Sequence, residues 1–520
     1  MSSAQSITSD LANPSRDQRS GEEGAESLKG AVVSDALATG VIFALLLTVL
    51  QRFMGFVRGI FFCRLMTPEE LGQFSLVAGG LLLLAPLAVL GLPGTLGRFV
   101  EHYSHRGQLQ SYLSRVTRVA FVMTVGLGLL MLALPNLFGF LLLGEVGHQR
   151  LIWLSVASLM GVAWNNYLTS VVEAMRQVRL ASLMRFITSS VLTVGGLILL
   201  FSFEAKTSAA VAALGLSSFC GALPAWWYLR SRRSAIAASS RPLPGSELWP
   251  RVLPFAAWWW FSNLLHNGYE LADRYLLIWM SGLGAAEIQA AAGQLHSAKV
   301  LPGLVVNVAA MLSGMLLPFV SAALVRGEPE KACRQLNWTL KLSGLVLLGV
   351  NFAILSFAPW LFNFFLRGKY GAGLELLPLT TVACSWFSLL TISQDWLWAR
   401  ERGRFAVFSL VLGLGVTLLS GWLLIPVNAA WGAVTATILG NSTALLAILI
   451  FNQSTGCSHD IGVWMALTFP LAVLGGPLVA AIAAIIVLYL LSSTDWYFDA
   501  GEREEVEQRI LSLLQRFRRG

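Results

Sequence analysis

The chain has 520 residues, of which 56% are hydrophobic and 12% are charged, against about 25% charged residues in an ordinary soluble domain. Of its 64 charged residues, nine lie within residues 1–36 and eleven within residues 495–520, which leaves 44 for the 458 residues between them. This composition excludes a soluble enzyme, a disordered scaffold and a nucleic-acid-binding protein. It predicts a polytopic membrane protein, in which the formal net charge of +8 comes from basic cytoplasmic loops.

Residues 1–36 are polar and lack the apolar core of a signal peptide. We expect them to form a disordered cytoplasmic tail, because such a composition cannot bury a hydrophobic core. The cysteines are odd in number and no two are close in sequence, so we interpret them as small apolar residues and neither as a disulfide framework nor as a metal site. They are Cys63, Cys220, Cys333, Cys384 and Cys457.

Thirteen apolar stretches are long enough to cross the ~30 Å hydrocarbon core as helices of about 20 residues. Their length and their content of Leu, Ala and Gly argue against the short alternating strands of a β-barrel, so we predict an all-α fold. In chain order the stretches are 37–62, 71–96, 116–143, 151–172, 181–203, 207–229, 252–280, 290–324, 338–362, 374–398, 405–426, 429–452 and 462–491.

The longest interruption, residues 230–250, is rich in Pro, Ser and Arg and is predicted to be a cytoplasmic linker. Six spans on either side give an N-lobe over 37–229 and a C-lobe over 251–452. An even number of spans in each half predicts two lobes in parallel repeat about an axis along the membrane normal. Faint internal similarity supports this plan, because one offset of 216 relates Arg58 to Arg274 and Gln73 to Gln289.

Residues 453–494 are predicted to add one or two transmembrane helices. One crossing would export the C-terminal tail with its five Arg, whereas two crossings need about 40 residues and about 30 are available. A break at Gly475-Gly476-Pro477 would give a short hairpin, and both alternatives remain open. The tail over 495–520 has apolar residues at helical spacing, so we expect an amphipathic helix on a membrane surface.

Lys and Arg are distributed unevenly between the two sets of loops. With a cytoplasmic N-terminus, the segments on the inside carry 22 of them and the opposite loops carry five. The positive-inside rule therefore predicts a multi-pass protein of the inner (cytoplasmic) membrane with its N-terminus and linker in the cytoplasm.

Ionisable residues at membrane depth are the strongest functional signal, because each is costly unless it faces a wet cavity or a partner. Arg52 and Arg58 lie in the first span, Arg274 in the seventh and Lys299 in the eighth. We expect these four cations to line a cavity between the lobes and to bind an anionic substrate. The alternative for each is a side chain that snorkels or is paired near a span end.

Three acids fall in the same regions and are expected to form gate or ion-pair contacts. They are Glu270, Asp273 and Asp395. Neighbours in a helix point about 100° apart, so Asp273 is expected to reach a cation on another helix, such as Arg58. No phosphate-binding loop, HExxH or Cys-x-x-Cys motif is present, and we expect a protein without metal, cofactor or enzymatic activity.

Three segments resemble the polysaccharide-type flippases of the multidrug/oligosaccharidyl-lipid/polysaccharide exporter superfamily. QRFMGFVRGIFFCRLMTPEELGQFSL (51–76) resembles the arginine-bearing first helix and the turn that follows it. GLPGTLGRFVEHY (91–103) resembles the Gly-rich end of the second span. YELADRYLLIWMSG (269–282) resembles the helix that opens the second half. The resemblance covers most of residues 34–452.

The resemblance implies a flippase for polyprenyl-diphosphate-linked oligosaccharide that works by alternating access in O-antigen, capsule or exopolysaccharide synthesis. Membrane lipid surrounds such a protein, and glycan polymerases or glycosyltransferases are its expected partners. Three alternatives stay open: a cation-coupled multidrug exporter, a peptidoglycan-precursor flippase, and a membrane polysaccharide polymerase. The polymerase is disfavoured because no loop is longer than about 25 residues. A drug exporter would be expected to carry acids in its cavity, and here the cations predominate.

Overall fold

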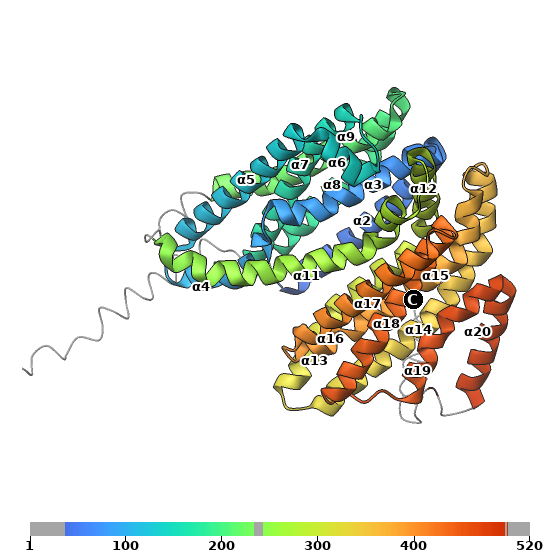
Figure 1. The fold of residues 1–520 in the computed structure, drawn as a ribbon. Coiled ribbons are helices and arrows are strands. Elements are labelled where there is room, and N and C mark those ends of the chain that lie inside the picture. Colours follow the sequence, from blue (N-terminus) through green and yellow to red (C-terminus); the bar gives the residue numbers. More distant parts are fainter. Residues whose placement is uncertain (1–36, 233–242, 494–496, 498–520) are drawn as a thin grey trace, which may run out of the picture.

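The computed structural model describes residues 37–232, 243–493 and 497, and it is all-helical over these residues (Figure 1). Three predicted segments lie outside the described residues: the disordered tail, residues 233–242 of the linker, and the amphipathic tail except for Tyr497. The first half contains α2 (Leu37–Leu65), α3 (Pro68–Ala88), α4 (Leu92–His105), α5 (Leu109–Ala133), α6 (Pro135–Leu143), α7 (Gln149–Ala174), α8 (Val178–Ser202) and α9 (Lys206–Ser231).

The second half begins with the long helix α11. It contains α11 (Gly245–Met280), α12 (Ala285–Val300), α13 (Pro302–Val325), α14 (Pro329–Trp360), the π-helical η1 (Leu361–Phe365), α15 (Gly371–Ser393), α16 (Asp395–Ala399), α17 (Gly403–Leu424), α18 (Ala429–Ser454), α19 (Ile461–Thr468), the 3-10 segment η2 (Phe469–Gly475) and α20 (Gly476–Ser493). Each of the thirteen predicted apolar stretches overlaps one or more of these helices.

Several predicted spans consist of two helices, because proline interrupts the helical hydrogen bonding. Pro135 and Pro302 are the first residues of α6 and α13, positions where the missing N–H of proline is not needed. The turn before α3 is also fixed locally. Thr67 Oγ1 accepts a hydrogen bond from the Glu70 amide, and the Glu70 carboxylate accepts one from the Thr67 amide, which forms a capping box.

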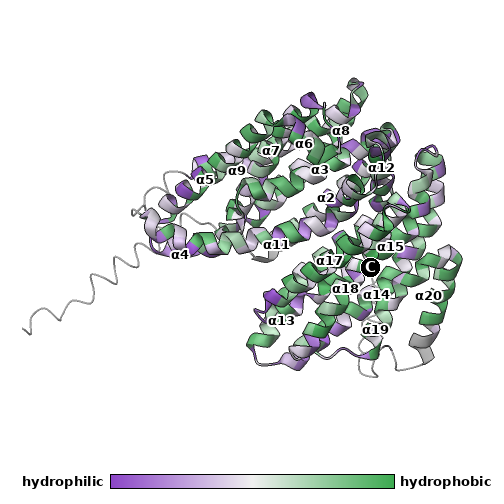
Figure 2. Cartoon of the chain, viewed as in Figure 1, coloured by the Kyte–Doolittle hydropathy of each residue, from purple (hydrophilic) through white to green (hydrophobic). Residues whose placement is uncertain are grey.

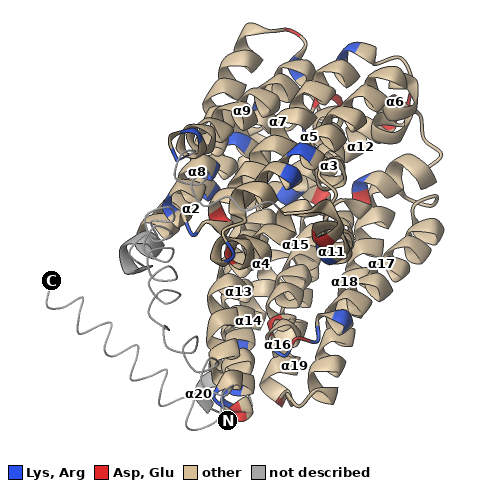
Figure 3. Cartoon of the chain, turned by 90° about the vertical axis from the view of Figure 1, so that its left-hand side faces the viewer, with Lys and Arg blue, Asp and Glu red and all other residues tan. Residues whose placement is uncertain are grey.

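Within the described residues, eleven helical segments are long and apolar enough to cross a membrane. Hydrophobic residues dominate the helices (Figure 2), and charged residues are sparse on them (Figure 3). Large apolar side chains such as Phe201, Leu419 and Ile485 are exposed on the outer surface, as expected where lipid and not water is the solvent. The protein is therefore a multi-pass membrane protein.

The helices form two bundles that meet along α3 and α12 and diverge toward the end where α4 and α16 lie (Figure 1). We call the end where they meet the closed end and the other the open end. The loops between α4 and α5, α7 and α8, and α13 and α14 belong to the open end. Backbones touch at the closed end: an added Cβ at Gly72 would overlap the Gln289 carbonyl oxygen, and one at Gly293 that of Pro68.

The last apolar stretch folds back on itself, which is the hairpin alternative. Gly476, at φ 85°, begins α20 after the break, a conformation that favours glycine. The two ends of the hairpin meet at the open end. Gly462 packs against the Tyr497 backbone, and the Tyr497 hydroxyl donates a hydrogen bond to the Lys341 carbonyl oxygen at 2.6 Å.

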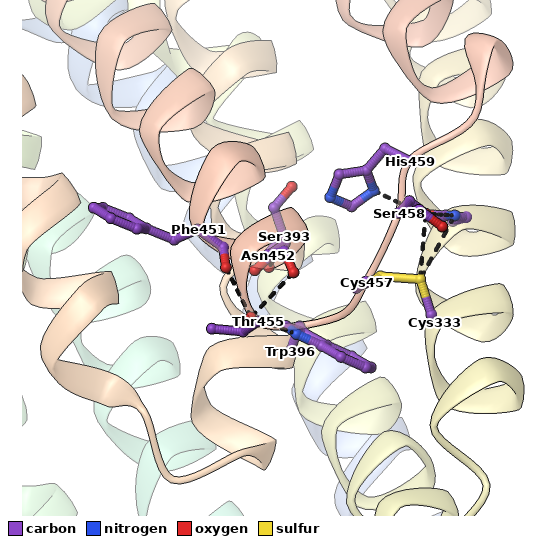
Figure 4. The surroundings of a disulfide bond; sticks show 10 residues. Cys333, Ser393, Trp396, Phe451, Asn452, Thr455, Cys457, Ser458 and His459 are labelled. Atoms are coloured by element: carbon purple, nitrogen blue, oxygen red, sulfur yellow. Dashed lines mark hydrogen bonds between the residues drawn. A yellow bond between two sulfur atoms is a disulfide. The ribbon is translucent and has the colours of Figure 1, made fainter.

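The interpretation of all five cysteines as isolated apolar residues is wrong for two of them. Cys333 at the start of α14 and Cys457 in the loop after α18 form a disulfide, with Cα atoms 5.2 Å apart (Figure 4). Their separation of 124 residues hid the pair, because only the packing of the lobe brings the two segments together. The other three cysteines are free and at least partly buried.

Hydrogen bonds and one ion pair reinforce the disulfide. Asn337 donates to the Ser458 carbonyl oxygen at 2.8 Å, and its side-chain oxygen lies 2.7 Å from His459 Nδ1. Lys341, almost fully buried, pairs with Asp460 at 2.5 Å. The loop before α19 is thus held on α14 by several independent contacts.

Candidate functional site

A cavity of about 500 Å³ lies between the two halves of the chain. Helices α2, α3, α7, α8 and α9 of the first half line it, together with α11, α12, α13, α15 and α18 of the second. All four predicted cations line this cavity: Arg52, Arg58, Arg274 and Lys299. Glu270 lines it as well.

The α2 wall of the cavity is made by residues that recur every three or four positions, which places them on one face of a helix. Arg52, Gly55, Gly59 and Phe62 follow this spacing, and Arg58 lies at its edge. Gly55 lies beside a guanidinium group, because a Cβ on Gly55 would be in van der Waals contact with Arg58 Nη2 at 3.9 Å. The second-half counterpart of this helix is α11, which contributes Arg274.

Two of the four cations have partners. Arg52 donates a hydrogen bond to Asn307 Oδ1 of α13, a contact between the two halves. Lys299 Nζ lies 2.5 Å from Asp273 Oδ2, and the side chains are 18% and 1% exposed. The expected partner of Asp273 was a cation such as Arg58, whereas in this conformation Asp273 pairs with the neighbouring helix α12 of its own half.

The other two cations, Arg58 and Arg274, lie without an acidic side chain within 4 Å among the described residues. Glu270 is the acid among the described cavity-lining residues, and the buried Asp273 neutralises Lys299 from behind the cavity wall, so the four cations exceed these two acids by two positive charges. Unpaired cations at membrane depth are costly unless water or an anion compensates them. The arrangement is suited to an anion with two charges.

Uncharged polar groups and aromatic rings complete the wall. His296, Asn307 and Asn441 line the cavity, and the rings of Tyr269 and Phe387 stack with centroids 6.2 Å apart. None of these residues was assigned to the site from the sequence. Amides inside apolar spans were the available signal for Asn307 and Asn441, because such groups need a partner in hydrocarbon.

Asp395 is not brought to the cavity. It lies in α16, where its carboxylate accepts a hydrogen bond from the Ser313 hydroxyl at 2.8 Å, and within the described residues no cation lies within 4 Å of it. Its position late in the tenth predicted span did not locate it, because depth alone does not say which face of a bundle a side chain occupies.

A polar chain crosses between the halves at the closed end. Gln73 Nε2 donates to Gln289 Oε1 at 2.8 Å, and Gln289 Nε2 donates to Glu145 Oε1 at 2.8 Å. The Thr207 hydroxyl lies 3.1 Å from Gln73 Oε1, and His148 lies 2.5 Å from Glu145. These contacts join the two halves at this end.

Comparison with known proteins agrees with this architecture. The family model described as "Polysaccharide biosynthesis protein" matches residues 37–325, which is more than half of the chain. No curated protein sequence matches the chain.

Solved structures share the fold at low sequence identity. "Lipid II flippase MurJ, inward closed conformation" aligns with a TM-score of 0.67 and 14% identity over 88% of this chain and 94% of its own. An inward-facing multidrug resistance MATE family transporter of the MOP superfamily aligns with a TM-score of 0.64 and 15% identity over 80% of this chain and 97% of its own. A MOP superfamily transporter from Pyrococcus furiosus aligns with a TM-score of 0.53 and 15% identity over 83% of this chain and 98% of its own. At such identities the likeness concerns the fold, and it confirms the predicted all-α transporter architecture.

Proposed function

Because the chain belongs to the polysaccharide biosynthesis protein family, whose fold is that of transporters and flippases, we propose that it is a flippase for polyprenyl-diphosphate-linked oligosaccharide. It would act without catalysing a covalent reaction, by alternating access across the cytoplasmic membrane in O-antigen, capsule or exopolysaccharide synthesis. The observation that carries this proposal is the pair of uncompensated arginines, Arg58 and Arg274, in the cavity between the lobes.

The charge of the substrate explains the cations. A diphosphate that crosses a medium of low dielectric needs opposite charges close by, because Coulomb energies rise as water is excluded. Guanidinium groups bind phosphate oxygens with two parallel hydrogen bonds. One arginine from each half would grip the diphosphate from both sides, and Lys299 lies on the same cavity wall as a further cation.

The rest of the substrate differs chemically from its head. Amides and aromatic rings such as Asn441 and Tyr269 are suited to sugar hydroxyls and sugar faces, while the polyprenyl chain would remain in lipid. The lobes would rock about the central site. The 22:5 distribution of Lys and Arg predicts that the open end faces the cytoplasm, so this conformation would receive the substrate from inside.

A peptidoglycan-precursor flippase is the second candidate. One of the structures that share the fold is that of a lipid II flippase, and both kinds of substrate have a diphosphate between lipid and sugar. A cation-coupled multidrug exporter is less well supported, because Glu270 is the acid among the described residues that line the cavity, and Asp273 beside it is buried and neutralised by Lys299. A membrane polymerase lacks support from the fold, and glycosyltransferases or a polymerase are better candidates for partners.

The test is the lipid-linked glycan content of a deletion strain. Loss of the protein should cause lipid-linked oligosaccharide to accumulate in the inner leaflet, and the wild-type gene should reverse this. An Arg58→Ala/Arg274→Ala variant, present in the membrane in the same amount, should fail to reverse the accumulation. The Arg404→Ala variant, whose change lies outside the cavity, should reverse it fully. Accumulation of peptidoglycan precursor instead would favour the second candidate, and accumulation of neither would refute the flippase.

A further inference from the structure

A second cavity lies on the outer side of the N-lobe, far from the central site. Helix α7 packs against both α5 and α9, and these three helices lie at the edge of the bundle away from the C-lobe (Figure 1). The groove between α5 and α9, with α7 as its floor, has a volume of about 570 Å³. No residue of this groove lines the central cavity.

The groove is polar at one end and apolar at the other. Arg118 of α5 and Arg230 of α9 flank its outer part near the open end, together with Gln110 and Ser114. Deeper in the membrane the wall is aromatic, since Phe121 and Trp164 lie there with ring centroids 6.2 Å apart. The depth follows from the chain, because α5 enters from the open end and turns apolar just after Arg118.

The two arginines are exposed. Among the described residues neither forms an ion pair, and no acidic residue in this part of the structure lines the groove. Arg230 lies 5.5 Å from the centroid of the Trp226 ring, an interaction that orients the guanidinium and leaves its hydrogen-bond donors available.

We infer that this groove binds an anionic phospholipid of the bilayer, with its phosphate between Arg118 and Arg230 and an acyl chain against Phe121 and Trp164. The occupant must match a cationic end at the membrane interface and an apolar end in the hydrocarbon region, and basic pockets between transmembrane helices recognise anionic head groups in this way. A free phosphate would leave the aromatic half of the groove unused. The inference is independent of the proposed transport substrate.

The experiment measures lipid binding by the purified full-length protein in detergent, by native mass spectrometry. Phosphatidylglycerol and phosphatidylcholine with identical acyl chains are compared. Wild-type protein should bind phosphatidylglycerol at least tenfold more tightly. Arg118→Ala/Arg230→Ala should weaken this binding about 30-fold, since each basic residue contributes about 1 kcal/mol, and should abolish the preference. Arg118→Lys/Arg230→Lys should retain most of it.

Arg326→Ala/Arg334→Ala is the matched control. It removes the same charge near the open end outside the groove, and should bind phosphatidylglycerol like the wild type. An equal loss of phosphatidylglycerol binding in both alanine double variants would show that only net charge matters and would overturn the inference. Equal affinity of the wild type for the two lipids would also overturn it. Displacement by inorganic phosphate alone, or a preference for polyprenyl phosphate over phosphatidylglycerol, would show a different occupant and overturn it too. Equal thermal unfolding of all variants without added lipid would exclude a folding defect.

Discussion

Gln73 Nε2 donates a hydrogen bond to Gln289 Oε1 at 2.8 Å. The two glutamines are 216 residues apart in sequence, which is the same offset that relates Arg58 to Arg274. Residues related by a two-fold axis can touch only where they lie at that axis. The glutamine pair therefore marks where the pseudo-two-fold axis of the two lobes passes through the closed end. The two arginines then line the cavity as equivalent residues on its two sides.

The glutamine pair should act as a latch for the closed end. Replacing Gln289 by Ala leaves Gln73 and Glu145 without their mutual partner, which should cost about 1 kcal/mol in this conformation and shift the equilibrium about 5-fold toward opening at this end. The native Cys384 lines the cavity, so its accessibility to a thiol reagent can report the opening of the closed end. In a Cys63→Ser/Cys220→Ser background, its labelling by an impermeant maleimide from the closed side should quicken about 5-fold. Gln149→Ala on the same surface is the control, and an unchanged rate in the Gln289 variant would contradict a latch.

Arg58 should be required for transport and dispensable for folding. Arg58→Lys keeps the charge and loses the two-pronged geometry, so it should retain partial activity. Arg58→Ala should reduce transport about tenfold or more, since a charged hydrogen bond contributes about 1.5–3 kcal/mol. The readout is lipid-linked glycan accumulation in complemented deletion cells at matched protein level. Normal transport by Arg52→Ala, Arg58→Ala and Lys299→Ala variants alike would contradict a cationic substrate site.

Much of this architecture was predictable from the sequence, because the membrane imposes long apolar helices and any charge within them stands out. Arg58, Arg274 and Lys299 were found in this way. Partners were not, because they depend on which faces of two helices meet: Asp273 meets Lys299, and Asp395 turns to Ser313. The Cys333–Cys457 bond was missed for the same reason.

The buried pair of Asp273 and Lys299 should contribute mainly to stability. Lys299→Ala leaves a carboxylate that is 1% exposed without compensation, which should destabilise the protein by about 3–5 kcal/mol. Lys299→Ala/Asp273→Ala removes both charges and should recover most of that loss. Thermal unfolding in detergent measures this. Equal destabilisation by the single and double variants would mean that the two charges are not coupled.

The loop before α19 should be sensitive to acid. Burial lowers the pKa of His459 to about 4, although Asp460 raises it in part. The unfolded chain takes up a proton near pH 6.5, so stability should be complete above that value, fall as the pH decreases toward 4, and level off below it. The expected loss is on the order of 2 kcal/mol between pH 7 and pH 4. His459→Gln should flatten this part of the pH profile of the unfolding temperature, and an unaltered profile would assign the acid sensitivity to other groups.

The disulfide offers a test of orientation, because Cys333 and Cys457 lie at the open end, which the Lys and Arg distribution predicts to be cytoplasmic. Thiols are kept reduced there, so the pair should be free in growing cells and should form the bond after oxidation, with about 2–4 kcal/mol of added stability. Labelling the free thiols of acid-quenched cells with a maleimide polymer shifts the protein on a gel according to the number of free cysteines. The Cys333→Ser variant identifies the band in which Cys333 is labelled. A bond already complete in untreated cells would place the open end in an oxidising compartment. Labelling of Ser20→Cys or Ser240→Cys in intact cells by an impermeant maleimide would independently contradict the predicted cytoplasmic location of the N-terminus and the linker.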